Sequence, residues 1–395
     1  MSSINKNKKI VLLLDGQTVQ ATAIAEYLKK SGCYIISFCD SNNSYGYHTK
    51  FVDKKILSPK SKTKGIYLSF LIDFLHDNKV DVIIPMNDDS ATFLSENKNL
   101  LSNEKARFII PDKDIFFQGF DKNQLMKLCH KNDFPHPRTA DLSEVTTKEA
   151  CSHVGFPAII KPNITTGGRG MQMIRTESQL SDILNPTINE YGDCHLQEFI
   201  QPGGKQFKVQ IYRDHLKNEI HSTVIEKMRY YPEKGGSSCF NKTIYFDELV
   251  QLCNSVLIKL KWDGFADFDL IEDPSDGIIK IMEINPRVPA CIKSSLVSGI
   301  DFALIILNKS LDMEIPPMKY EPNKYLRYIA LDLLWFIYSP NRFKTKPNWF
   351  IFFGKNLFYQ DFTWKDLRPF IFGFLGGLLK QFNPKFRKSK KGLRV

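Results

Sequence analysis

The sequence predicts a mixed α/β protein that contains two differently built kinds of sheet, and two patterns lead to that prediction. Short apolar runs alternate with helical segments between residues 8 and 115, which is typical of a parallel sheet covered by helices on both faces. Beyond residue 150, strand-like segments follow one another directly between turn signals, which indicates antiparallel pairing. The 395 residues are 43% hydrophobic and 25% charged, a composition that excludes disordered and collagen-like chains.

The first 115 residues are expected to form a four-stranded sheet with intervening helices. We place strands at 10–14, 34–39, 80–85 and 108–111, and helices at 18–30 and 66–78. The turn Asp15-Gly16-Gln17 does not have the Gly-x-Gly-x-x-Gly spacing, so it is not a dinucleotide-binding fingerprint. Eight scattered cysteines without a Cys-x-x-Cys pair, and an N-terminal apolar run too short for a signal peptide, predict a reduced cytoplasmic protein.

A strand that delivers a lysine into a glycine-rich loop is the most specific feature of the middle of the chain. The segment runs from Gly155 through Lys161 to Met171. Glycines let backbone N–H groups approach phosphate oxygens, while the lysine and the threonine hydroxyls add charge and donors. The spacing differs from that of a P-loop. Taken alone, the segment also fits a hairpin turn with a surface lysine.

Two acidic strands form a predicted hairpin further along the chain. Residues 265–272 and 277–283 flank the turn Asp273-Pro-Ser-Asp-Gly277, which is a strong turn signal. Because side chains alternate between the faces of a strand, Asp267 and Asp269 share one face. Apolar neighbours argue against the alternative, a hairpin whose acids are simply solvated.

The second strand of this hairpin continues the polar pattern. Glu283 and Asn285 share one face, so pairing of the two strands gathers several oxygen ligands at one place. Such hard ligands suit Mg²⁺, which prefers carboxylates together with substrate phosphates. Arg287 follows closely enough to stabilise charge on a transferred phosphoryl group.

Together these segments resemble the ATP-grasp superfamily, specifically its carbamoyl-phosphate-synthase-like and carboxylate–amine ligase branch. The resemblance covers residues 8–310, and its strongest element is Met282-Glu-Ile-Asn-Pro-Arg287. It implies an α/β and α+β fold in which a Rossmann-like pre-ATP-grasp domain precedes a two-lobed ATP-grasp domain. We therefore expect three parts: the Rossmann-like domain at 1–115, the ATP-grasp domain at 116–312 (lid 161–171, metal site 263–287) and a helical, aromatic, basic extension at 313–395.

The resemblance also implies which residues bind ATP. Lys122 matches the first phosphate-binding lysine, and Lys161 matches the second. Gln206 falls where many members carry an acid for the ribose hydroxyls, which is a departure from the family pattern. The other matches are the lid residues Thr165, Thr166, Gly167, Gly168 and Gly170, and the adenine-reading hinge residues Glu198, Phe199 and Ile200.

Further matches concern the reaction itself. Lys227, which we count with the nucleotide-binding set, and Arg229 match a basic pair near the acyl-phosphate site. We expect Arg287, Lys161 and Arg229 to be catalytic. The expected metal ligands are Asp269, Glu283 and Asn285.

The implied activity is ADP-forming carbon–nitrogen ligation with ATP and Mg²⁺, with Mn²⁺ as an alternative metal. A small-molecule carboxylate becomes an acyl phosphate, and an amine then displaces phosphate to give an amide. Two alternatives remain: a subunit of a carboxyphosphate or carbamoyl-phosphate synthetase, and a non-catalytic ATP-binding protein. We leave a homo-oligomer open and expect no nucleic-acid partner.

The C-terminal 77 residues differ from the rest of the chain in charge and composition. They hold 16 Lys or Arg against four acids, whereas the preceding 318 residues carry a net charge of −1. They also hold 12 of the 30 Phe and three of the four Trp. The apolar runs 328–338 and 369–379 are too short to span a bilayer, and residues 384–395 carry six basic residues and no acid.

Aromatic anchors beside basic residues predict a peripheral contact with an anionic membrane, at its inner face. A glycan or lipid-linked precursor would then be the substrate. The alternative is a helical subdomain that packs on the catalytic core.

Overall fold

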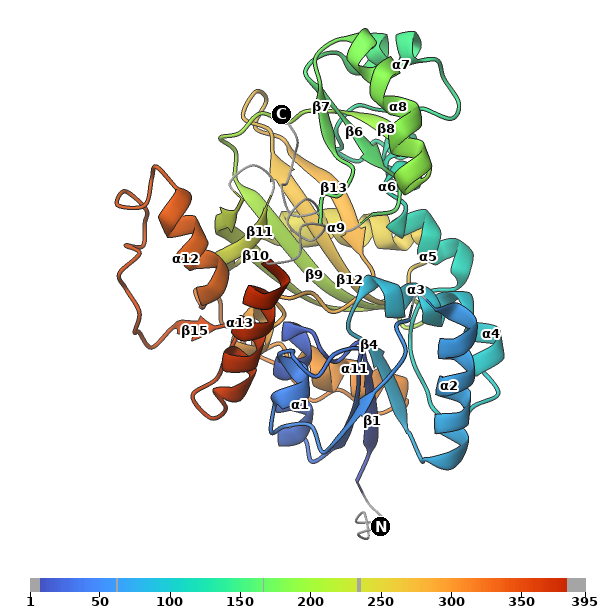
Figure 1. Ribbon diagram of the computed structural model, residues 1–395, viewed down its shortest axis with the longest axis vertical. Helices are drawn as coiled ribbons and strands as arrows, with labels where there is room; N and C mark the ends of the chain where they lie inside the picture. Colours follow the sequence, from blue (N-terminus) through green and yellow to red (C-terminus); the bar gives the residue numbers. More distant parts are fainter. Residues whose placement is uncertain (1–7, 62, 166, 233–235, 382–395) are drawn as a thin grey trace.

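The computed structural model describes residues 8–61, 63–165, 167–232 and 236–381 and arranges them around three sheets (Figure 1). The N-terminal sheet is at the bottom of the view, a small lobe in green is at the upper right, and a large sheet lies between them. The orange to red C-terminal segment flanks the left side.

The N-terminal sheet is parallel and has the strand order β3-β2-β1-β4. Its strands are β1 (Ile10–Leu14), β2 (Tyr34–Cys39), β3 (Lys54–Leu57) and β4 (Val82–Pro85). Its helices are α1 (Val19–Lys30), α2 (Lys64–Asp77), α3 (Asp88–Glu96) and α4 (Lys98–Leu101), and a 3-10 turn, η1, spans Gly46–His48.

The prediction of one of the four strands in this sheet is wrong. Residues 108–111 are not a strand, because the chain makes only an isolated bridge to Val82 through Arg107 and then reaches Pro111, which has no N–H to donate. The fourth strand is instead β3, an edge strand that begins with two lysines and therefore lacks the apolar run by which buried strands are recognised.

The small lobe carries the glycine-rich segment. Its antiparallel sheet has the order β5-β8-β6-β7, and helices α7 and α8 cover it. The predicted strand, loop and strand are confirmed as β6 and β7. The bounds are β5 (Thr139–Asp141), α7 (Thr147–Val154), β6 (Ala158–Pro162), β7 (Gln172–Ile174), α8 (Glu177–Tyr191) and β8 (Cys194–Glu198).

The large sheet has seven strands in the order β13-β12-β9-β10-β11-β14-β15. Five antiparallel strands form its main part, and the predicted acidic hairpin is confirmed as β12 and β13. Those strands are β9 (Gln206–Asp214), β10 (Glu219–Tyr231), β11 (Ser237–Ile244), β12 (Gly264–Glu272) and β13 (Ile279–Asn285). Helices α5 (Lys113–Phe120), α6 (Lys122–Lys131) and α9 (Asp247–Leu260) pack against it.

Two helices after the hairpin return to the N-terminal sheet. These are α10 (Lys293–Val297) and α11 (Phe302–Ser310), and Phe302 and Ile305 share one buried core with Val11 and Leu13. The expected boundary at 115 falls inside α5, and α11 packs with the first part of the chain. The three-part division stays a prediction, and residues on either side of each expected boundary, after 115 and after 312, pack against one another.

The described part of the C-terminal segment is folded against both larger units. It contains β14 (Tyr325–Arg327), α12 (Ile329–Tyr338), β15 (Leu357–Tyr359) and α13 (Arg368–Gln381), so it is not purely helical. The Tyr45 and Tyr328 hydroxyls lie 3.1 Å apart, and Asp366 accepts a 2.6 Å hydrogen bond from the Lys50 N–H. No helix among the described residues is long and apolar enough to cross a membrane.

Candidate active site

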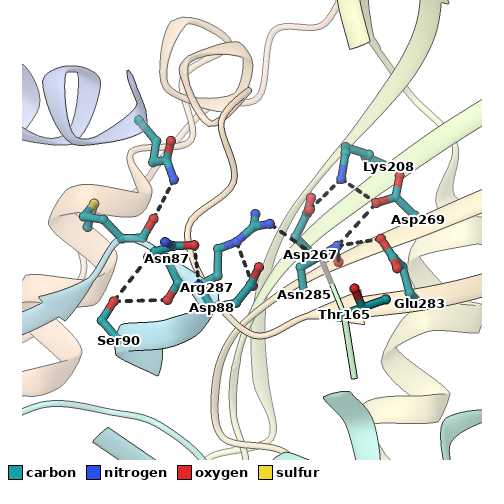
Figure 2. Close-up of polar contacts among 12 residues, drawn as sticks. Asn87, Asp88, Ser90, Thr165, Lys208, Asp267, Asp269, Glu283, Asn285 and Arg287 are labelled. Atoms are coloured by element: carbon teal, nitrogen blue, oxygen red, sulfur yellow. Dashed lines mark hydrogen bonds and ion pairs between the residues drawn. The ribbon is translucent and has the colours of Figure 1, made fainter. Parts of the chain in front are cut away.

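A cluster of charged side chains lies where β9, β12 and β13 are paired (Figure 2). The register places Asp269 opposite both Glu283 and Lys208. Lys208 Nζ bridges two carboxylates, at 2.6 Å from Asp267 Oδ2 and 2.7 Å from Asp269 Oδ2. Lys227 adds a second cation, 2.5 Å from Asp269 Oδ1.

These contacts set the charge of the two aspartates. Burial favours the neutral form and raises the pKa of Asp267, although Lys208 opposes this effect. Burial acts on Asp269 as well, but the combined charges of Lys208 and Lys227 outweigh it and lower the pKa of Asp269 below the usual range. Asp269 is therefore a carboxylate at neutral pH.

Glu283 and Asn285 lie on β13 beside the aspartates. Asn285 Nδ2 donates to Asp269 Oδ2 at 3.3 Å and lies 3.5 Å from Glu283 Oε1. Lys122, at the start of α6, reaches the same place: its Nζ is 3.4 Å from Glu283 Oε2 and donates to the Thr165 carbonyl at 2.9 Å. Lys122 thus connects the glycine-rich loop to the acidic hairpin.

Arg287 connects this cluster to the N-terminal sheet. Its Nη2 donates to Asn285 Oδ1 at 3.3 Å, and its Nε donates to Asp88 Oδ1 at 3.0 Å. Asp88 is the first residue of α3, with two residues between it and the end of β4, and its side chain is buried. Burial alone would lower the pKa of Arg287, but Asp88 and Asp267 raise it, so the guanidinium stays charged.

Lys161 lies near the end of β6, in the small lobe. Its Nζ donates to Gln197 Oε1 at 2.5 Å. Burial lowers the pKa of Lys161 to about 8, with Glu283 opposing and Lys122 reinforcing the shift. No carboxylate forms an ion pair with Lys161 among the described residues, which leaves its charge available to an anionic ligand.

This shift predicts a pH dependence of nucleotide binding. Above pH 8 the buried Lys161 loses its proton, so we expect the Kd for ATP to rise by up to about tenfold per pH unit, with a proton taken up on binding. Because the unfolded chain holds this proton up to about pH 10.5, the contribution of Lys161 to stability rises with pH between about 8 and 10.5.

Calorimetry in buffers of different ionisation enthalpy measures this proton uptake. Lys161→Gln is expected to bind ATP weakly at every pH and without proton uptake above pH 8. Lys148→Gln changes an exposed lysine on α7 of the same lobe and serves as the matched control. A Kd for the unmodified protein that is constant between pH 7.5 and 9.5 contradicts the prediction.

The lid glycines have the backbone that a phosphate-binding loop needs. Gly167, Gly168 and Gly170 all have positive φ, and a Cβ on Gly170 would lie 2.7 Å from Pro162 Cγ. The loop therefore accepts close packing that other residues would obstruct. Thr165 Oγ1 lies 3.4 Å from the Arg169 carbonyl, and Thr166 lies outside the described residues.

The predicted hinge follows β8. Glu198 is held by Arg138 at 3.0 Å, and the Phe199 N–H donates to the Pro157 carbonyl at 3.3 Å. A cavity of about 190 Å³ opens beside Glu198 and Phe199. Ile200 is buried, whereas Gln206 is half-buried at the start of β9 and opposite Lys227.

The structure does not bring Arg229 to this cluster, although it lies only two positions after Lys227. A register irregularity of β10 lies between the two residues. Arg229 Nε donates to Asp332 Oδ1 at 2.8 Å, and the guanidinium packs 4.0 Å from the Phe240 ring centroid. Arg229 therefore contacts the C-terminal segment rather than the cluster, and its catalytic role stays a prediction that these contacts do not support.

The oxygen atoms of this cluster could supply part of the coordination shell of Mg²⁺, with phosphate and water supplying the rest, but not a complete shell. Across the described residues, no three His, Cys, Asp or Glu side chains gather in a way that could hold a metal ion by themselves. Asp269 and Glu283 nevertheless bring carboxylate oxygens together beside the Asn285 amide, whose nitrogen faces them while its oxygen accepts from Arg287. Asp267 Oδ1 is buried without a hydrogen-bond partner in the same described region. Mg²⁺ commonly binds one or two carboxylates and completes its shell with phosphates and water.

Two members of the cluster were not selected from the sequence. Lys208 shares one face of β9 with Gln206 and Gln210, and it resembles a solvated strand lysine until its pairing with Asp269 is known. Asp88 belongs to an Asn-Asp-Asp-Ser sequence that resembles an ordinary helix N-terminus, and in the structure Asn87 and Ser90 of this sequence do cap α3. Its contact with Arg287 spans 199 positions of sequence, so no local pattern could identify it.

Known proteins resemble this chain over the region just described. Residues 121–313 match the family described as the ATP-binding domain of the carbamoyl-phosphate synthase L chain. A D-aspartate ligase of Enterococcus faecium is 25% identical over 315 residues, which cover 73% of this chain and 73% of that protein.

Two solved structures share the fold at low sequence identity. Biotin carboxylase of Campylobacter jejuni, described as a β-γ-ATP complex, has a TM-score of 0.65 at 18% identity and covers 80% of this chain and 74% of its own. The biotin carboxylase domain of 2-oxoglutarate carboxylase from Hydrogenobacter thermophilus, solved with MgADP and bicarbonate, has a TM-score of 0.64 at 17% identity over 80% of this chain and 73% of its own. The predicted fold class is confirmed.

Proposed function

Because this chain belongs to the ATP-grasp superfamily of ligases, we propose that it activates a small-molecule carboxylate with ATP and joins it to an amine. The γ-phosphoryl group passes to a carboxylate oxygen, which gives an acyl phosphate and ADP. The amine nitrogen then attacks the acyl carbon, phosphate leaves, and the nitrogen loses a proton. The observation that supports this proposal best is the cluster of Lys122, Glu283 and Arg287, which joins α6 to β13 and, through Asp88, to the N-terminal sheet.

The proposed roles follow from charge and position. Lys122 and Lys161 would hold the phosphate oxygens, as their proximity to Glu283 supports. Arg287, fixed by Asn285 and Asp88, would neutralise the charge of the phosphoryl group in transfer. Asp269, Glu283 and Asn285 would hold Mg²⁺, which neutralises phosphate charge when bound.

A two-substrate experiment tests this function. With Mg-ATP we expect ADP and phosphate release only when a carboxylate and an amine are both present, and chelation with EDTA should stop it. Amino acids, uronic acids and sugar nucleotides form the first pools, and mass spectrometry should show an amide product. If no pair of substrates releases ADP although ATP binds, the ligase proposal fails for these classes.

Carboxyphosphate chemistry is the second candidate, because the family match and the biotin carboxylase likeness support it. It predicts ADP release with bicarbonate alone. Dependence on an organic carboxylate, without any response to bicarbonate, would exclude it in favour of the leading proposal.

We also propose a glycan or lipid-linked precursor as the acceptor, and a peripheral position at the inner face of a membrane. The support is the composition of the C-terminal segment, which combines aromatic and basic residues. Precursors with and without a lipid carrier, compared as acceptors at equal concentration, distinguish the two forms of substrate.

A further inference from the structure

Exposed apolar side chains are concentrated in one stretch of the C-terminal segment. Of the 23 large hydrophobic residues that are exposed among the described residues, 12 lie between Leu333 and Leu375. Large aromatic rings stand out, because Phe343 and Trp364 are each 69% exposed and Phe353 is 79% exposed. Single exposed apolar residues are ordinary, but such a concentration marks an interaction surface.

The exposed charges of this stretch all have one sign. Its acids lie inward: Asp361 and Asp366 are buried, as is Asp332 just before it. Asp332 and Asp366 are also engaged by Arg327 and by the Lys50 N–H, respectively. The exposed charged residues from 333 to 376 are therefore basic, namely Lys344, Lys346, Lys355, Lys365 and Arg368.

The scaffold beneath this surface is well packed. Phe336 of α12 contacts Trp349, with ring centroids 4.1 Å apart, and the Arg327 guanidinium lies 4.7 Å from the Trp349 ring centroid. β15 extends the large sheet through its pairing with β14. The segment forms the orange to red flank of the molecule (Figure 1). Three of its exposed rings, Phe343, Phe350 and Trp364, contact rings of this scaffold and are therefore not part of a collapsed tail.

We propose that this aromatic–basic surface docks on an anionic lipid membrane. We define the surface by its rings Phe343, Phe350, Phe353 and Trp364 and by its cations Lys344, Lys346, Lys355 and Lys365. The rings would enter the boundary between headgroups and acyl chains, and the cations would pair with lipid phosphates. The inference rests on the peripheral position in the proposed function and gives it a specific surface.

Charge favours a membrane over a second copy of the chain. A two-fold dimer through this surface would oppose the same basic patch on both subunits, because such an interface is self-complementary. Like charges would then repel at close range. An anionic bilayer accepts both the rings and the cations, and its negative potential attracts them.

Vesicle binding of the full chain tests the surface without any turnover, so its outcome is separate from that of the ligase proposal. The probes are vesicles of phosphatidylcholine alone and of phosphatidylcholine with phosphatidylglycerol. Trp364 is the one exposed tryptophan, and all four tryptophans of the chain are described. We expect binding to the anionic vesicles only, with a blue shift of emission and quenching by brominated lipid. Trp364→Phe should remove the blue shift and keep most of the binding.

Charge and ring variants locate the contact. Lys344→Gln with Lys355→Gln should weaken partitioning by about 30-fold, because each cation near an anionic surface contributes roughly fivefold. Phe343→Ser with Phe353→Ser should weaken it by about tenfold or more. The matched controls change exposed residues elsewhere and should bind like the unmodified protein: Lys148→Gln with Lys259→Gln, and Leu216→Ser.

Three results would overturn the proposal. The first is no binding to anionic vesicles at low salt. The second is binding that leaves Trp364 emission unchanged and is insensitive to both sets of variants, because the contact would then lie elsewhere on the chain. The third is self-association that shifts Trp364 emission without lipid, which would assign the surface to a second copy.

Discussion

Arg287→Ala is expected to lower kcat for substrate-dependent ADP release by about a thousandfold. A single preorganised donor at a developing charge typically contributes 10²–10³ in rate, and an arginine on a transferred phosphoryl group contributes 10³ or more. Arg287 is preorganised, since Asn285 and Asp88 hold its Nη2 and Nε at 3.3 and 3.0 Å. Because its proposed role belongs to the transition state, the Kd for ATP should change by only a few fold.

Matched variants separate catalysis from structural damage. Arg287→Lys keeps the charge but loses the planar fork, so it should recover only part of the activity. Asp88→Asn leaves Arg287 in place with a weaker orienting contact and should cost less than Arg287→Ala. Arg175→Ala, on the exposed surface of the small lobe, should have no effect. An Arg287→Ala enzyme that folds, binds ATP and turns over at the normal rate would remove Arg287 from the mechanism.

The features that could be predicted from the sequence are those that depend on local periodicity. The hairpin of β12 and β13 follows from alternation and a strong turn, and it brings Asp269, Glu283 and Asn285 together as expected. The edge strand β3 was missed because it carries two lysines and has no apolar run. The tertiary contacts could not be predicted from the sequence for a different reason. Arg287 contacts Asp88, and Lys208 contacts Asp269, only after segments distant in the sequence pack together.

The position of Arg229 was mispredicted because its strand is irregular, and side chains in an irregular strand do not alternate regularly between the two faces. Alternation would place Arg229 on the same face as Lys227, and hence at the charged cluster. The pairing of β10 with β11 is irregular on both sides of Arg229, between Lys227 and Arg229 and again between Arg229 and Tyr230, and such bulges re-aim side chains. Its partner, Asp332, comes 103 positions later. Neither the irregularity nor the partner can be recognised from the sequence around Lys227 and Arg229.

Asp332→Ala is expected to lower the free energy of unfolding by roughly 3–5 kcal/mol, because it leaves buried guanidinium groups without their counter-charge. Asp332 is 0% exposed and accepts hydrogen bonds from Arg229 at 2.8 and 3.0 Å and from Arg327 at 2.6 Å. Its backbone carbonyl also accepts from Trp349 Nε1 at 3.2 Å. Urea unfolding measures the loss, and Asp301→Ala, which removes the N-cap of α11, serves as a smaller reference, at about 1 kcal/mol.

A compensated variant then decides what Arg229 does. Replacing Arg229 and Arg327 by Met together with Asp332→Leu exchanges the buried charges for apolar side chains, and such exchanges are often neutral or stabilising. We expect the triple variant to regain most of the stability that Asp332→Ala loses. If Arg229 only supports the C-terminal segment, substrate-dependent ADP release should also return to within a few fold of normal. A triple variant that is as stable as the unmodified protein, yet a hundredfold slower with unchanged ATP affinity, would return Arg229 to the reaction and contradict its structural assignment.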